Sequence, residues 1–255
     1  MIQPTLLFGA ALSILSASIY YYVGRVLSRR HVASLDARLA WTLFVIWWYA
    51  LATSTLIGAL LTLLGALRMI ALPLFITLTE FNLLALCIGL YGLMYYLLYL
   101  FTGSRRLLVP LTLFYIGYYI LVIYFVQSRN PVDVSVGRWN ATLQYEKAAE
   151  GPLFLVALLL LIFPQVIGSL AYFTLYFRVK TSTQKYRIIL VSWSIIIWFM
   201  SGFLASISGL GQQDWWQIVS RLIALSASLA ILLAYDPLPW IRRRLGVSSI
   251  AEEPA

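Results

Sequence analysis

The stretch Leu72–Phe101, LPLFITLTEFNLLALCIGLYGLMYYLLYLF, decides how the rest of the chain is interpreted. It is apolar enough to lie in lipid. At about 1.5 Å per residue, a helix of this length crosses the roughly 30 Å hydrocarbon core of a bilayer with some tilt. Glu80 nevertheless lies inside the stretch, with Thr77 and Asn82 close by. An ionisable group at that depth is costly unless it is paired, protonated or facing water. Glu80 is therefore a candidate functional residue.

The composition of the whole chain is typical of a membrane protein. Of its 255 residues, 62% are hydrophobic and 11% are charged, whereas a soluble domain has about 25% charged residues. The net charge of +9 is then explained by basic cytoplasmic loops and does not indicate nucleic-acid binding. The single cysteine, Cys87, has no partner for an internal disulfide, and the single histidine is His31. No metal site and no cofactor are therefore expected.

Long apolar runs, separated by basic or polar connections, predict an all-α integral membrane protein with seven transmembrane helices in one domain, residues 1–245. The predicted spans are 6–23, 39–67, 72–101, 107–126, 152–177, 188–207 and 215–235. Residues 246–255 are predicted to form a short disordered tail. The longest loop runs from Gln127 to Glu150. It is either a lid over an outer pocket or a polar connection.

The basic residues are distributed unevenly between the two ends of this predicted bundle. Thirteen Lys and Arg residues fall in the first, third and fifth loops and the exit segment, and four fall on the opposite side. The positive-inside rule therefore puts the N-terminus outside and the C-terminus in the cytoplasm of a multi-pass cell-membrane protein. An odd number of spans agrees with termini on opposite sides.

Arg221 is the other ionisable residue well inside a predicted span. Glu80 and Arg221 each lie about seven residues, or about 10 Å, past the outer start of their helices. We hypothesise that they pair at matched depth, with Thr77 and Asn82 completing the hydrogen bonds. Alternatively, Arg221 extends outward alone, and Glu80 pairs with Arg68 or is protonated. A pair would be either a structural clamp or the polar floor of a ligand pocket open to the outside.

Pro164 and Gln165 lie in the middle of the fifth predicted span. A proline there frees a carbonyl group and usually kinks the helix. The kink beside Gln165 is either part of a binding site or simple helix geometry. The candidate ligand-binding residues are therefore Glu80, Asn82, Arg221, Thr77 and Gln165.

The order of these features resembles the seven-helix sensor region at the N-terminus of some bacterial histidine kinases and related signalling proteins. The matching features are an arginine loop and a tryptophan-bearing helix, a third helix that ends in aromatics and a glycine-arginine turn, the start of the fifth helix and a basic entry to the sixth. They are Arg29–Arg38, Trp41–Tyr49, Tyr95–Arg106, Gly151-Pro152 and Tyr186-Arg187. The resemblance covers nearly the whole chain.

Members of that group continue into a cytoplasmic output domain, whereas eleven residues follow Arg244 here. The resemblance therefore implies a stand-alone sensor that acts through a separate cytoplasmic signalling protein at the basic loops. Microbial rhodopsins also have seven helices, but they hold retinal on a lysine of the last helix. This chain has no lysine after Arg187, so a covalent retinal pigment is excluded.

The expected function is thus a receptor-like sensor that is not an enzyme. It would lie in the lipid bilayer and bind a small-molecule ligand in an outer-half polar pocket. Catalysis inside the membrane needs titratable groups within reach of one another, and the spans offer one carboxylate and no histidine. A small-solute transporter is an alternative, although such proteins usually show internal repeats. A structural subunit of a membrane complex is another alternative.

Overall fold

The apolar stretch that begins at Leu72 folds as one uninterrupted helix, α3 (Leu72–Thr102). Pro73 lies in its first turn, where the missing N–H leaves no helical hydrogen bond unmade. The helix ends at Gly103, whose φ of 61° allows its N–H to donate to the carbonyl oxygen of Tyr99. Thr77, Glu80 and Asn82 therefore lie on a continuous helix.

The computed structural model describes residues 3–30, 34–69, 71–147, 152–207 and 213–247. Within these residues the chain forms eight α-helices, two short 3-10 helices and one two-stranded sheet. The other α-helices are α1 (Pro4–Ser28), α2 (Leu35–Ala66), α4 (Leu108–Ser128), α5 (Pro152–Thr174), α6 (Ser182–Ile207), α7 (Asp214–Tyr235) and α8 (Pro239–Leu245). The 3-10 helices are η1 (Arg105–Leu107) and η2 (Leu175–Phe177), and the strands are β1 (Pro131–Val136) and β2 (Ala141–Tyr145).

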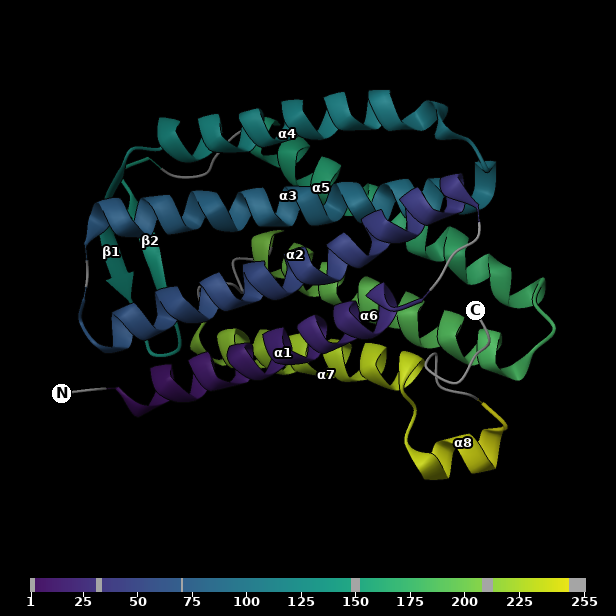
Figure 1. Ribbon diagram of the computed structural model, residues 1–255. Helices are drawn as coiled ribbons and strands as arrows, with labels where there is room; N and C mark the ends of the chain where they lie inside the picture. The colour runs from purple at the N-terminus through teal and green to yellow at the C-terminus, as the bar shows by residue number, and fades with distance from the viewer. Residues whose placement is uncertain (1–2, 31–33, 70, 148–151, 208–212, 248–255) are drawn as a thin grey trace.

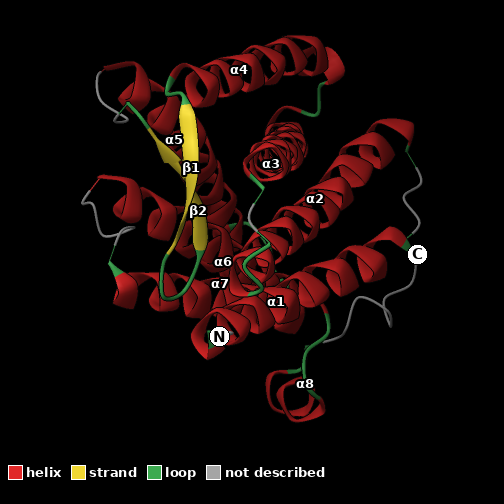
Figure 2. Ribbon diagram, turned by 90° about the vertical axis from the view of Figure 1, so that its left-hand side faces the viewer, coloured by secondary structure: helices red, strands yellow, loops and turns green. Residues whose placement is uncertain are grey.

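Helices α1 to α7 form a closed ring of neighbours. Each packs on the next along the chain, and α7 packs back on α1. Figure 1 shows the long helices side by side, with the hairpin at one end and α8 at the other, and Figure 2 shows the ring from the hairpin end. In the part of the chain that the structure describes, five helical segments are long and apolar enough to cross a membrane: Pro4–Ser28, Leu35–Ala66, Leu72–Thr102, Arg105–Ser128 and Trp215–Tyr235. Together they indicate an integral, multi-pass membrane protein.

The remaining two predicted spans also coincide with helices. Span 152–177 is α5 followed by η2, and span 188–207 lies inside α6, which begins earlier, at Ser182. The exit segment, which carries Arg242, Arg243 and Arg244, forms the short helix α8. Of the predicted tail, residues 248–255 lie outside the described residues.

The core is built on the tryptophan-bearing face of α2. Trp47 and Trp48 are almost fully buried. The Trp48 ring lies 6.1 Å from that of Tyr20 on α1, measured between ring centroids. Two glycines of α3 allow α2 to approach closely. A Cβ at Gly89 would lie 2.9 Å from the Trp47 ring, and one at Gly92 would collide with the backbone carbonyl oxygen of Leu43. Small residues at the contact are what bring two membrane helices together.

The loop between α4 and α5 is a structured β-hairpin, which the sequence analysis did not predict. Strands β1 and β2 pair in antiparallel fashion. Apolar residues of the hairpin bury themselves against the ends of α2 and α3. This small cluster consists of Val134 and Ala141 with Leu61 and Phe75. The hairpin therefore packs on the end of the bundle as a cap, and its action as a lid over a pocket stays a prediction.

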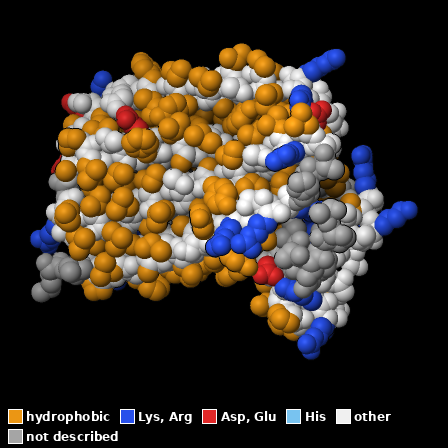
Figure 3. Space-filling view, in the orientation of Figure 1, with side chains coloured by type: hydrophobic (Ala, Val, Ile, Leu, Met, Phe, Trp, Pro, Cys, Tyr) orange, Lys and Arg blue, Asp and Glu red, His pale blue; other side chains and the backbone are white. Residues whose placement is uncertain are grey.

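The two ends of the bundle differ in charge. Figure 3 shows Lys and Arg side chains gathered mainly at the end opposite the hairpin, while apolar side chains cover the belt between the ends. Among the described residues, two ion pairs lie at the basic end. Arg105 pairs with Asp36, and Arg242 pairs with Asp236 at 2.6 Å. The apolar belt and the basic rim match the pattern of a protein seated in a bilayer.

Candidate functional site

Arg221 on α7 lies where three other elements meet. Its Nη2 donates to the backbone carbonyl oxygen of Trp139, at 2.6 Å, and to Oγ1 of Thr62, at 3.2 Å, while Nη1 lies 3.4 Å from Oγ of Ser13. The guanidinium thus joins the turn of the hairpin, α2 and α1. Gly9 makes room for it, because a Cβ there would lie 2.5 Å from Nη1. In the described part of the chain, every hydrogen-bond partner of Arg221 is neutral.

A cavity of about 440 Å³ opens beside this guanidinium at the hairpin end of the bundle. Its wall is formed mainly by hydroxyl and amide side chains. Besides Arg221, the polar lining residues are Ser13, Thr55, Thr62, Asn140, Thr142, Gln217 and Ser220. Trp216 lines the same cavity, and its indole N–H is buried without a hydrogen-bond acceptor among the described residues. The cavity therefore presents one cation, and its wall contains one residue, Trp216, whose buried donor has no acceptor among the described residues.

The predicted pair between Glu80 and Arg221 is not formed. Glu80 accepts a hydrogen bond from Nε2 of Gln127 at the end of α4, and no ion pair of Glu80, with Arg68 or another residue, occurs in the described chain. The physical reason is that α3 and α7 are not neighbours in the ring, since α1 and α2 lie between them. Matched depth on two helices means only that the two residues lie at the same level along the bundle axis. The direction in which each side chain points depends on the rotation of its helix.

The other predicted site residues are also dispersed. Oδ1 of Asn82 accepts a hydrogen bond from Oγ of Ser54 at 2.5 Å, which joins α3 to α2. Gln165 is fully buried, and its Nε2 donates to Oη of Tyr115 at 3.1 Å, which joins α5 to α4. Thr77 is exposed on α3. Of the five predicted residues, Arg221 alone lines the cavity at the hairpin end.

Sequence reasoning missed the contribution of the hairpin to this site. The signal was present in the alternation Val132-Asp133-Val134-Ser135-Val136, which has the period of a β-strand. The hydroxyls of Thr62 and Ser13 had no distinguishing sequence signal, because such residues are common in membrane helices. Their position opposite Arg221 follows from packing. Among the described residues, no group of three His, Cys, Asp or Glu side chains is placed to hold a metal ion.

Comparison with protein-family models finds no matching family, and no curated protein matches the chain either. The similarity to kinase-associated sensor regions therefore stays a prediction.

Proposed function

We propose that this protein is a seven-helix membrane sensor whose outer cavity binds a small molecule with a carboxylate group. The hairpin end faces the outside and the basic end faces the cytoplasm. The observation that carries the proposal is the partly buried Arg221, which faces a polar cavity and has only neutral partners among the described residues.

A cation in this setting favours an anionic ligand. Removing a charge from water costs free energy, and neutral acceptors compensate for only part of that cost. The planar fork of a guanidinium matches a carboxylate with two parallel hydrogen bonds. A single cation is balanced by a single negative charge, which favours a carboxylate over a doubly charged phosphate.

The size of the cavity fits this class of ligand. Small-molecule sites in proteins have volumes of about 300 to 1,000 Å³, and the outer cavity has about 440 Å³. Its wall comes from α1, α2, α7 and the hairpin. A ligand bound there would contact elements that are far apart in the chain. It would therefore stabilise one arrangement of these elements relative to others.

Helix α7 connects the cavity to the basic end. Arg221 lies near the outer start of α7, and the helix runs on to Tyr235. Immediately beyond it, Asp236 accepts from Arg242 of α8. A change in the position of α7 on ligand binding would therefore reach the surface that carries Arg242. That surface and the neighbouring basic loops are where a cytoplasmic signalling protein would dock.

A thermal-shift screen tests the ligand class. The protein is reconstituted in nanodiscs and screened with small carboxylic acids, each matched with its uncharged amide. A ligand at about 100 times its Kd stabilises the folded state by about 2.7 kcal/mol, which is readily visible as a rise in Tm. We expect at least one acid to raise the Tm while its amide does not. The ligand class is wrong if no acid differs from its amide.

Two further measurements test the rest of the proposal. A membrane-impermeant maleimide applied to intact cells should label a cysteine at Lys147 and not one at Arg106, since both positions are exposed and lie at opposite ends. Reversed labelling would overturn the orientation. Uptake of the stabilising acid into proteoliposomes separates a sensor from a transporter. A sensor gives no uptake above that of protein-free liposomes.

A further inference from the structure

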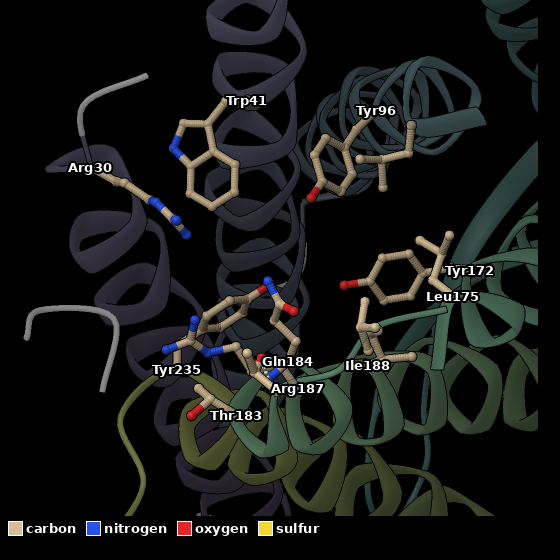
Figure 4. A pocket seen from close by; sticks show the side chains of 13 residues that line it. Arg30, Trp41, Tyr96, Tyr172, Leu175, Thr183, Gln184, Arg187, Ile188 and Tyr235 are labelled. Carbon is tan, nitrogen blue, oxygen red and sulfur yellow. Dashed lines mark hydrogen bonds between the residues drawn. The ribbon is translucent and has the colours of Figure 1, made fainter. Parts of the chain in front are cut away.

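A second cavity of about 440 Å³ lies at the basic end of the bundle, far from Arg221. It is bordered by the inner ends of α2, α3, α5, α6 and α7, with Arg30 just beyond the end of α1 (Figure 4). Its charged and aromatic lining residues are Arg30, Trp41, Tyr96, Tyr172, Arg187 and Tyr235. The described residues that line it include two arginines and no Asp or Glu.

The polar groups of this cavity converge. In Figure 4 the guanidinium of Arg30 and the hydroxyls of Tyr96 and Tyr172 point into the same space, while Arg187 borders it beside Tyr235. Arg30 is held near the ring of Trp41, with 5.5 Å between the guanidinium carbon and the ring centroid. Positively charged groups and phenol donors thus reach the cavity from two halves of the ring, the α1–α3 half and the α5–α7 half.

Arg187 is fixed more firmly than Arg30. Its side chain is 8% exposed, and its Nε donates to the backbone carbonyl oxygen of Ala234 at 3.2 Å. Its guanidinium carbon lies 6.0 Å from the centroid of the Tyr235 ring. A guanidinium has five N–H donors in a rigid fork. Arg187 therefore contributes a buried and well-fixed positive charge to the cavity wall.

We propose that this inner cavity binds a phosphate group, carried by an anionic phospholipid of the inner leaflet. Two guanidinium groups and two phenol hydroxyls supply the charge and the hydrogen-bond donors that phosphate oxygens require. Basic pockets between membrane helices on the cytoplasmic side suit lipid headgroups. A free phosphorylated solute has the same chemistry, but the apolar part of the wall favours a lipid. Leu100, Leu175, Val179 and Ile188 line that part, where an acyl chain would pack.

The inference does not depend on the outer cavity or on its ligand. A phosphate in the inner cavity would contact Arg30 and Tyr96 in one half of the ring, and Tyr172 and Arg187 in the other. It would therefore join the inner ends of the two halves. Occupancy should stabilise the bundle and resist movement of α6 and α7 relative to α2 and α3.

Lipid binding is tested on the full chain in nanodiscs. One set contains phosphatidylcholine alone and a second contains added phosphatidylglycerol. Native mass spectrometry measures the lipid retained, and a thermal melt measures the Tm. We expect phosphatidylglycerol to be retained in preference to phosphatidylcholine and to raise the Tm. A third arm adds glycerol phosphate to the phosphatidylcholine set. Stabilisation there, without a preference for phosphatidylglycerol, would identify a soluble phosphate as the source.

Matched variants locate the site. Arg30→Gln should weaken phosphatidylglycerol retention about tenfold, since a hydrogen bond to a charged group contributes about 1.5 kcal/mol or more. Arg106→Gln removes an exposed arginine from the same end, outside the cavity lining, and should have little effect. Tyr172→Phe removes one hydroxyl and nothing else, so it tests the cavity even if Arg30→Gln folds poorly. The proposal is wrong if no phosphate compound stabilises the protein, or if Arg30→Gln and Tyr172→Phe behave like Arg106→Gln.

Discussion

Replacing Thr62 by valine should measure how strongly α2 holds Arg221. Thr62 is buried, with 2% exposure, and its Oγ1 accepts from Nη2 of Arg221 at 3.2 Å. The same hydroxyl donates to the carbonyl oxygen of Gly58 in its own helix. Valine keeps the shape of threonine and removes both bonds. Thr55 provides a matched control, because it lines the same cavity and bonds only within its own helix, to Leu51.

The expected size of the effect follows from the charge and the length of the bond. Hydrogen bonds to charged groups contribute about 1.5 to 3 kcal/mol in soluble proteins, and interhelical bonds in membranes average about 0.6 kcal/mol. A bond of 3.2 Å is at the long end of the usual range. We therefore expect Thr62→Val to lower the free energy of unfolding by about 1 to 1.5 kcal/mol more than Thr55→Val.

Unfolding by SDS in mixed micelles, followed by circular dichroism, gives this difference directly. A double-mutant cycle identifies its source. In an Arg221→Met background, Thr62→Val should cost no more than Thr55→Val, because the charged donor is absent. The reasoning is refuted if the two valine variants are equally stable in the wild-type background. It is also refuted if the difference between them persists without Arg221.

Two other predictions concern the packing of α3 and the hairpin. Gly92→Ala should destabilise the bundle by about 2 kcal/mol, because its Cβ would meet the backbone of Leu43. Gly117→Ala, where a Cβ meets nothing within 4 Å, should be neutral or slightly stabilising in the same melt. Burial raises the pKa of Tyr145 in β2, although the charge of Arg129 lowers it in part. The raised pKa favours the protonated phenol in the folded state. The hairpin should therefore be fully stable below about pH 10 and lose stability at higher pH. Hydrogen exchange of residues 131–145 should show this loss, and Tyr145→Phe should reduce it.

The positions of the membrane helices could be predicted from the sequence because they depend on length and apolarity. The run from Leu72 to Phe101 is helical throughout, as predicted. The observed helix ends differ from the predicted span ends by a few residues, because polar residues continue the helix beyond its apolar part. The clearest case is α6, which begins at Ser182 through polar residues that precede its apolar segment.

The arrangement of polar residues around the bundle could not be predicted in the same way. Glu80 and Arg221 have similar depths, but their partners are set by which helices are adjacent and how each is rotated. The carbonyl oxygen of Trp139, the acceptor closest to Arg221, belongs to the backbone of a hairpin turn. Every residue type carries the same backbone carbonyl group, so the residue type does not show which carbonyl will accept a hydrogen bond. The inner cavity could not be predicted either, because its lining residues come from segments that are far apart in the chain, from Arg30 to Tyr235.

The most direct test of the account is a fluorescence titration of the outer cavity. Trp216 lines that cavity beside Arg221, so a bound carboxylate should change its emission in a saturable way. The titration uses the acid that stabilises the protein most in the thermal-shift screen. We predict that the saturable change is lost in Arg221→Gln and kept in Lys147→Gln, which removes an exposed charge from the same end. Equal binding by the wild type and Arg221→Gln would contradict the assignment of Arg221 as the anion-binding residue of the proposed sensor.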